Sequence, residues 1–163
     1  MKKYSLLLIL IGWSAMLMSQ EKMQSTAAPD PRIKVDEVVT TNHQTTVKGK
    51  TFPYKATTGT QPVWNADGKA IAAVHYTYYE RSDIKNKASR PIVISFNGGP
   101  GSGSVWMHLA YTGPMILKVD NEGFPIQPYG VKSNPNSILD VADIVFVNPV
   151  NTGYSRILDK SVK

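Results

Sequence analysis

The segment Asn97–Gly103 is the part of this sequence best suited to chemistry, because four of its seven residues are glycines. Glycine loses more backbone freedom on folding than other residues, so this cluster is costly unless the backbone must turn sharply or present bare amides. The segment follows an apolar run and precedes a helix candidate. Amides at a strand end and a helix start favour negative charge, so the loop is a candidate anion site.

Three occupants of this loop can be weighed. A nucleotide phosphate is disfavoured, because Ser102-Gly103-Ser104-Val105 lacks the lysine of a phosphate-binding loop and the glycine spacing does not match a dinucleotide fingerprint. A purely structural turn remains open. The favoured occupant is the oxyanion of an acyl-transfer transition state. In α/β-hydrolases, a glycine-rich loop after an early strand supplies one stabilising amide, and the residue after the nucleophile supplies the other.

The sequence contains no nucleophile to accompany this loop. A hydrolase nucleophile would read Gly-x-Ser-x-Gly, and neither Ser155 nor Ser102 stands in that context. Ser102 and Ser104 are better interpreted as caps of a helix that begins near Ser104. The histidine base follows the nucleophile in the hydrolase order, so we expect His75 and His108 to be packing or surface residues and all three triad members to lie beyond Lys163.

Cofactor and metal chemistry find no support in the sequence. The chain has three isolated histidines and no cysteine, so we expect no metal site and no cofactor. Tyr76, Tyr78 and Tyr79 could form a platform for carbohydrate or peptide, but a half-buried strand explains them more simply.

Two apolar runs predict the sheet that positions the loop. Residues 91–96 and 143–147 are nearly continuous apolar segments, which is typical of central parallel strands covered on both faces. A helix candidate, Ser104 to Tyr111, lies between them and ends at Gly113-Pro114.

The remaining segments predict antiparallel structure. Residues 36–82 are β-prone, with a hairpin turn at 65–68. Residues 118–135 are rich in glycine and proline and predict a hairpin or ordered loop, and 137–140 predict a helical turn. Antiparallel hairpins that lead into a central, mostly parallel sheet indicate the N-terminal part of an α/β fold. Two parallel strands cannot cover both faces of their sheet, so we expect this domain, 36–163, to be incomplete.

The first 19 residues predict a signal peptide. Lys2 and Lys3 precede an apolar run from Leu6 to Trp13, which is short for a bilayer span, although an uncleaved anchor is the alternative. Residues 20–35 predict a flexible lead-in. We therefore expect an exported protein, periplasmic or extracellular, that has no stable membrane insertion after signal removal and, without cysteines, no disulfides.

The net charge of +6 comes from scattered lysines and arginines. No dense basic stripe appears, so a solvated surface is favoured over nucleic-acid binding.

Three ordered motifs carry a resemblance to a known family. The chain resembles the serine carboxypeptidases, of which carboxypeptidase Y is an example, and specifically a bacterial-type member. The matching segments are Ile92–Ser104 with its Asn-Gly-Gly-Pro-Gly core, Thr112-Gly113-Pro114, and Asn134–Arg156.

The resemblance implies a fold, an activity and individual roles. It implies an α/β-hydrolase that releases C-terminal residues from peptides, with the Gly99 amide as one oxyanion donor. Asn97 and Gly98 would bind the terminal carboxylate of the substrate, and Tyr154 would line the substrate cleft. For Asn97 the alternative is a turn residue that bonds its own loop, and for Tyr154 it is packing.

Three positions depart from the family pattern. Ser102 stands where many members have Cys, Asn148 where Asp is usual, and Asn151 where Gly is usual. Asn tolerates positive φ better than most residues. As an N-terminal fragment without the triad, the chain alone is expected to be inactive. An esterase or acyltransferase on the same fold and a non-catalytic secreted β-rich binding domain remain alternatives.

Overall fold

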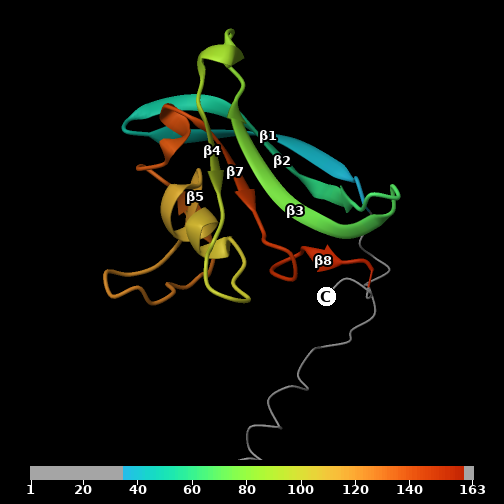
Figure 1. Ribbon diagram of the computed structural model, residues 1–163. Coiled ribbons are helices and arrows are strands. Elements are labelled where there is room, and N and C mark those ends of the chain that lie inside the picture. The colour runs from blue at the N-terminus through green and yellow to red at the C-terminus, as the bar shows by residue number, and fades with distance from the viewer. Residues whose placement is uncertain (1–34, 160–163) are drawn as a thin grey trace, which may run out of the picture. The chain divides into compact units, whose positions relative to one another are not determined.

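The computed structural model describes residues 35–159 (Figure 1). The predicted signal peptide and nearly all of the predicted lead-in lie outside the described residues. The described chain forms eight strands and three short helical segments: β1 Val38–Val47, β2 Lys50–Trp64, β3 Ala70–Arg81, η1 Lys87–Ser89, β4 Ile92–Ser95, η2 Met107–Thr112, β5 Met115–Leu117, β6 Val131–Ser133, η3 Ile138–Asp140, β7 Asp143–Val147 and β8 Arg156–Ile157.

Strands β1, β2 and β3 form a long antiparallel ribbon. The predicted turn at 65–68 is confirmed. The Asn65 Oδ1 atom accepts hydrogen bonds from the amides of Asp67 (3.1 Å) and Lys69 (2.8 Å), and Gly68 takes a φ of 73°. The side chain of Asn65 thereby substitutes for backbone partners inside a tight turn, which fixes the register of the two strands.

The sheet is mixed, with the strand order β1-β2-β3-β7-β4. The two apolar runs pair in parallel, as predicted, with Ile94 opposite Val145. All the other pairings are antiparallel, and β7 lies between β3 and β4 (Figure 1). Among the described residues the parallel part is therefore limited to β4 and β7, and the sheet is not mostly parallel.

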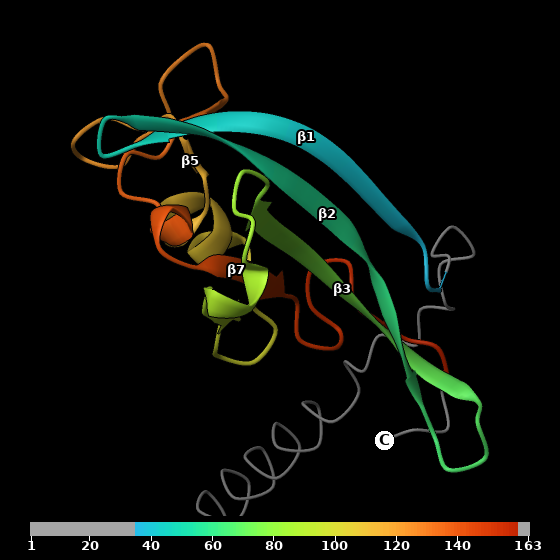
Figure 2. The ribbon, with the colours of Figure 1, turned by 90° about the horizontal axis from the view of Figure 1, so that it is seen from above.

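One face of the sheet carries the core. Figure 2 shows the helical segments η2 and η3 and strand β5 on the concave side of the β1–β3 ribbon. The buried cluster on this side consists of Val47, Phe52, Tyr54, Tyr79, Leu139, Ile144 and Phe146. Tyr76 and Tyr78 are partly buried and Tyr79 is buried, which confirms the half-buried strand predicted for the tyrosines.

The predicted connections between the apolar runs are also present. Helical backbone reaches Thr112 and stops at Gly113, and β5 pairs with β6 across the glycine- and proline-rich segment. The turn at 138–140 is capped by Ser137, whose Oγ atom accepts from the Leu139 amide at 3.2 Å.

The prediction that β4 is covered on both faces is wrong for the described residues. Ile92 and Ile94 are 58% and 63% exposed, and Phe96 beyond them is 64% exposed. Strand β4 lies at the edge of the sheet, and in the described chain no element packs on the face that these side chains share. An apolar run reports which side chains avoid water, and only packing decides whether a second layer covers them.

Candidate functional site: the glycine loop and its supports

The glycine loop follows the carboxyl end of β4 and leads into the helical segment that begins at Val105. Gly99 and Gly101 have φ angles of 81° and 83°. Residues with a Cβ atom are strained in this region, so these two positions explain the need for glycine. A Cβ atom added at Gly98, Gly99 or Gly101 would meet nothing within 4 Å, so the outer side of the loop is open.

The amides of Gly98 and Gly99 have no acceptor among the described residues. Both glycines are exposed. Unpaired amides at a strand end are suited to a ligand that carries negative charge. The two glycines predicted from the sequence thus lie together with their donors unused.

The Asn97 side chain braces the loop. Its Nδ2 atom donates to the Ser102 Oγ atom at 2.6 Å and to the Gly98 carbonyl at 3.2 Å. This geometry is the turn interpretation that the sequence left open for Asn97. A carboxylate that used the same Nδ2 group would replace one of these two bonds.

Ser104 connects three elements and was missed as a functional support by sequence reasoning. Its buried Oγ atom donates to the Val147 carbonyl and accepts from the Asn97 amide at 3.3 Å. Its own amide donates to the Asn148 Oδ1 atom at 2.9 Å. The prediction that the Ser104 side chain caps the helix is wrong, because its hydroxyl joins the ends of β4 and β7 instead, and only its carbonyl accepts from the helix, from the His108 amide at 2.9 Å.

The turn after β7 packs against the loop. Asn151 has a φ of 64°, the positive angle that the sequence allowed for. A Cβ atom on Gly153 would lie 2.6 Å from the Asn148 side chain, and one on Gly103 would lie 3.2 Å from the Gly153 amide. Glycine at both positions therefore permits a backbone approach that side chains would prevent.

Ser155 is buried and forms hydrogen bonds that hold this same turn against β3. Its Oγ atom donates to the Asn148 carbonyl at 2.7 Å and accepts from the His75 amide at 2.8 Å. The sequence excluded Ser155 as a nucleophile, and the structure gives its hydroxyl two backbone partners instead.

Tyr154 and His75 lie at a cavity of about 640 Å³ on the sheet face. Their ring centroids are 5.1 Å apart, and Tyr154 is 70% exposed. The cavity is lined by residues of β1, β2, β3 and β7, by the helical segment, and by Gly103 and Ser104 at the end of the glycine loop, but not by Asn97, Gly98 or Gly99. Of the predicted site residues, the loop residues lie together, and Tyr154 lies at a cavity that adjoins the far end of the same loop.

His108 is a packing residue, as predicted. Its ring stacks on Phe146 with centroids 4.5 Å apart, and its Nε2 atom shares a 2.6 Å hydrogen bond with the Tyr79 hydroxyl. Burial, with a smaller contribution from the nearby His75, lowers the pKa of His108 to about 4. Burial likewise raises the pKa of Tyr79. Both side chains are therefore neutral at physiological pH.

Two further properties concern the described chain, residues 35–159. Within it, no three His, Cys, Asp or Glu side chains are grouped so that they could hold a metal ion. No helix in this part is long and apolar enough to cross a membrane.

Comparisons with known proteins agree with the loop motifs. The family model described as serine carboxypeptidase matches residues 48–162. Two similar proteins, both called carboxypeptidase Y homolog A, come from Pyrenophora tritici-repentis and Leptosphaeria maculans. Each is 35% identical over 82 residues, which is 49% of this chain and 13% of the relative. The chain thus spans a small part of the curated relatives it matches. Because the family model covers well over half of its residues, the chain belongs to the serine carboxypeptidase family.

Proposed function

We propose that this chain carries the oxyanion and substrate-carboxylate portion of a serine-type carboxypeptidase of the bacterial type. The Gly99 amide is one oxyanion donor, and Asn97 with the Gly98 amide binds the free C-terminal carboxylate of a peptide. Tyr154 lines the approach of the substrate. The observation that carries this proposal is the pair of exposed, unused amides at Gly98 and Gly99.

The carboxylate is the ligand that best matches the loop. The Gly98 amide is a donor fixed by backbone geometry, so it needs no reorganisation when the charged carboxylate arrives, which is the property that makes such donors effective. Asn97 is already held beside this amide by Ser102 at 2.6 Å. Exchange of that bond for a charge-assisted bond to a carboxylate is favourable, because bonds to ionised acceptors are roughly twice as strong as neutral ones.

Binding can be tested with two peptides that differ only at the C-terminus. An N-blocked dipeptide with a free carboxylate is expected to shift the NMR signals of the Gly98 and Gly99 amides, and the same dipeptide as its C-terminal amide is not. Equal responses to both peptides, or no response at millimolar peptide, would contradict the proposal.

A matched pair of variants separates the Asn97 role from general charge effects. Asn97→Asp puts a negative charge beside the bound carboxylate and is expected to abolish the shifts. Asn121→Asp adds the same charge in the turn that follows Asp120 and is expected to leave them unchanged.

The chain by itself is expected to be inactive, because its sequence contains no Gly-x-Ser-x-Gly segment. Incubation of the full chain with the blocked dipeptide should release no amino acid above the buffer rate. Turnover at an enzyme-like rate, inhibited by a serine-directed reagent, would show that the chain has a nucleophile we have not identified.

Export is the proposed location, and it rests on the layout of residues 1–19. Expression of the chain with its own N-terminus in a bacterial host should yield a periplasmic or extracellular product whose N-terminal residue lies near Gln20. A product that retains Met1 in the membrane fraction would favour the anchor alternative.

A further inference from the structure

We propose that Asn148 is a positioning residue. It joins the glycine loop to β3 through an ordered chain of hydrogen bonds that requires a neutral His75 with its proton on Nε2. The chain runs from the Ser104 amide through Asn148, His75 and Thr58. The donor and acceptor pattern of this hydrogen-bond chain can be tested independently, but the importance of the chain for catalysis rests on the function proposed above for the loop.

The first bond fixes the orientation of the Asn148 amide. The Ser104 amide can only donate, and it lies 2.9 Å from the Asn148 side-chain oxygen. The opposite amide orientation would set the Nδ2 group against this N–H, so the oxygen must face Ser104. The Nδ2 group then faces the His75 Nδ1 atom at 3.1 Å.

The second bond fixes the tautomer of His75. Because the Asn148 Nδ2 group is a donor, Nδ1 must accept, and the imidazole proton must be on Nε2. Nε2 lies 3.1 Å from the Thr58 Oγ1 atom. The Thr58 hydroxyl in turn lies 3.1 Å from the Tyr76 carbonyl, which can only accept. The donor direction is therefore set at both ends by backbone groups.

The surroundings of His75 favour the neutral ring. Thr58 from β2 and Asn148 from the end of β7 carry no charge, and the Tyr154 ring lies beside the imidazole in a tilted arrangement with centroids 5.1 Å apart. His108 is the other titratable group that interacts with His75 electrostatically. Burial lowers the pKa of His75, which is consistent with the tautomer deduced from the contacts.

Protonation of His75 would break this chain. A proton on Nδ1 would face the Asn148 Nδ2 group, so that two donors oppose each other. If the Asn148 amide turned to relieve this contact, its Nδ2 group would oppose the Ser104 amide instead. Either response alters the bond at Ser104, whose hydroxyl also holds the Asn97 amide at the start of the loop. The charge of His75 is thereby coupled to the position of the loop.

The donor and acceptor pattern of these hydrogen bonds can be tested by NMR on the full polypeptide chain. At pH 7.5 the imidazole nitrogen shifts of His75, assigned with His75→Gln, are expected to show a protonated Nε2 and a bare Nδ1. As pH falls, the Ser104 and Gly103 amide signals should move with the midpoint of His75. The proposal would be overturned by a His75 ring that is protonated on Nδ1 at pH 7.5. It would also be overturned if the Ser104 and Gly103 amide shifts did not change as His75 titrates.

Asn148→Asp provides a sharper test, because it retains an acceptor for Ser104 but places an acceptor opposite Nδ1. The proton of His75 is expected to move to Nδ1, and its pKa to rise by roughly one unit or more. The Ser104 amide should then no longer follow the titration, since the protonated ring fits the carboxylate. Asn65→Asp, in the distant β2–β3 turn, should change none of these signals.

A third variant, Asn148→Ala, removes both bonds and should speed hydrogen exchange at the Ser104 amide roughly fivefold or more. If Asn148→Ala does not fold, the tautomer change in Asn148→Asp still decides the question. An unchanged tautomer in Asn148→Asp would contradict the proposal. Failure of the peptide-binding experiment would leave all of these readouts unaffected, so the two proposals can fail separately.

Discussion

Individual residues of the glycine loop differ in what they demand of the backbone. Gly98 and Gly99 are neighbours, both are exposed, and both have open space where a Cβ atom would go. Only Gly99 has a positive φ, 81°. Alanine substitutions at these two positions therefore distinguish the cost of backbone strain from the cost of a steric clash.

Gly99→Ala is expected to destabilise the chain by about 1 kcal/mol or more, because alanine is strained at this φ although no atom obstructs its methyl group. Urea unfolding of the full chain measures the change. Gly98→Ala is the control, and its stability should be equal or slightly higher, since alanine restricts the unfolded chain. An equal loss in both variants would show that contacts, and not strain, determine the cost.

Sequence reasoning identified the loop residues but not their supports. Asn97, Gly98 and Gly99 could be found from the glycine cluster. Ser104 was predicted only as a helix cap and Asn148 only as a departure from the family pattern, because their partners, the Val147 carbonyl and the His75 ring, are 43 and 73 positions away. Only pairing of β4 with β7 and of β7 with β3 brings these groups together.

At the scale of elements, the helical segment η2 depends on a partly buried, neutral histidine. His108 packs between Tyr79 of β3 and Phe146 of β7. Its pKa lies at about 4 in the folded chain, against 6.5 for a free histidine. The unfolded chain therefore takes up a proton at this position at higher pH than the folded chain does.

Acid is thus expected to weaken the fold through His108. The contribution of His108 to stability is complete above pH 6.5 and falls as pH drops from 6.5 to about 4. The total loss is on the order of 3 kcal/mol at most. Urea unfolding at pH 7 and pH 4 measures it, with His108→Gln as the comparison, because glutamine retains a partner for Tyr79 but does not titrate in this range. The pH dependence of the two proteins should differ by this amount, and identical dependences would contradict the assignment.

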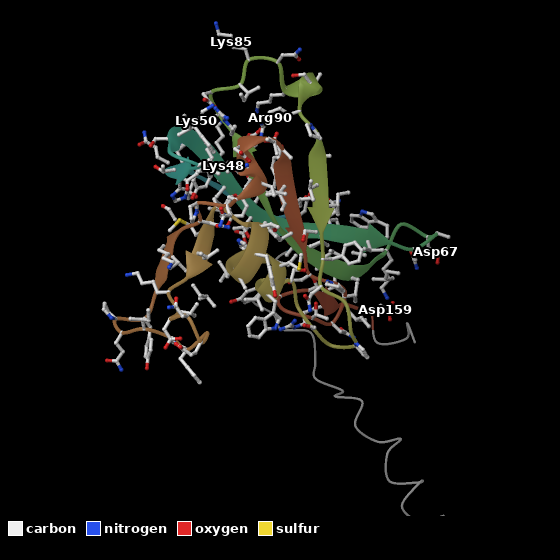
Figure 3. All side chains as sticks on the ribbon, turned by 90° about the vertical axis from the view of Figure 1, so that its left-hand side faces the viewer. Lys48, Lys50, Asp67, Lys85, Arg90 and Asp159 are labelled. Atoms are coloured by element: carbon white, nitrogen blue, oxygen red, sulfur yellow. The ribbon has the colours of Figure 1, made fainter. Side chains whose placement is uncertain are left out.

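At the scale of the whole described unit, a buried ion pair between Arg90 and Asp143 joins the start of β4 to the start of β7. Arg90 lies at the start of β4 (Figure 3), and its Nε atom is 3.0 Å from the Asp143 carboxylate. The two side chains are 8% and 9% exposed. Arg90 also donates to the Leu139 carbonyl at 3.1 Å, and Asp143 accepts from the Arg81 amide at 3.2 Å.

Arg90→Ala is expected to cost about 3 to 5 kcal/mol, because it leaves the Asp143 charge buried without its partner. Lys69→Ala is the matched control, since the Lys69 side chain is 66% exposed in its pair with Asp159. Because the lysine of this pair is solvated, the pair should contribute less than about 1 kcal/mol. Equal effects in chemical denaturation would show that solvent reaches the Arg90 pair as well.

The exposed edge of the sheet predicts self-association. Within residues 35–159, strand β4 presents Ile92 and Ile94 on a face that no element covers, and it lies at the edge of the sheet, where backbone groups can pair with another chain. Sedimentation of the full chain should show a mass that rises with concentration. Ile94→Lys should shift the distribution toward the monomer, whereas Val141→Lys, an equally exposed apolar position outside the sheet, should not. If both variants behave like the original chain, association does not use β4.

The sequence by itself determined the local elements and the family. Turn residues with special backbone needs, such as Asn65 and Gly68, and continuous apolar runs such as β4 and β7 act over a few positions, so their pattern can be read directly. The glycine cluster identified the loop for the same reason. Tertiary structure alone decided the mixed strand order, the exposure of β4, and the connection of the loop to His75 through Asn148. These features depend on which distant segments pack together, and a hydrogen-bond partner many positions away leaves no local trace in the sequence.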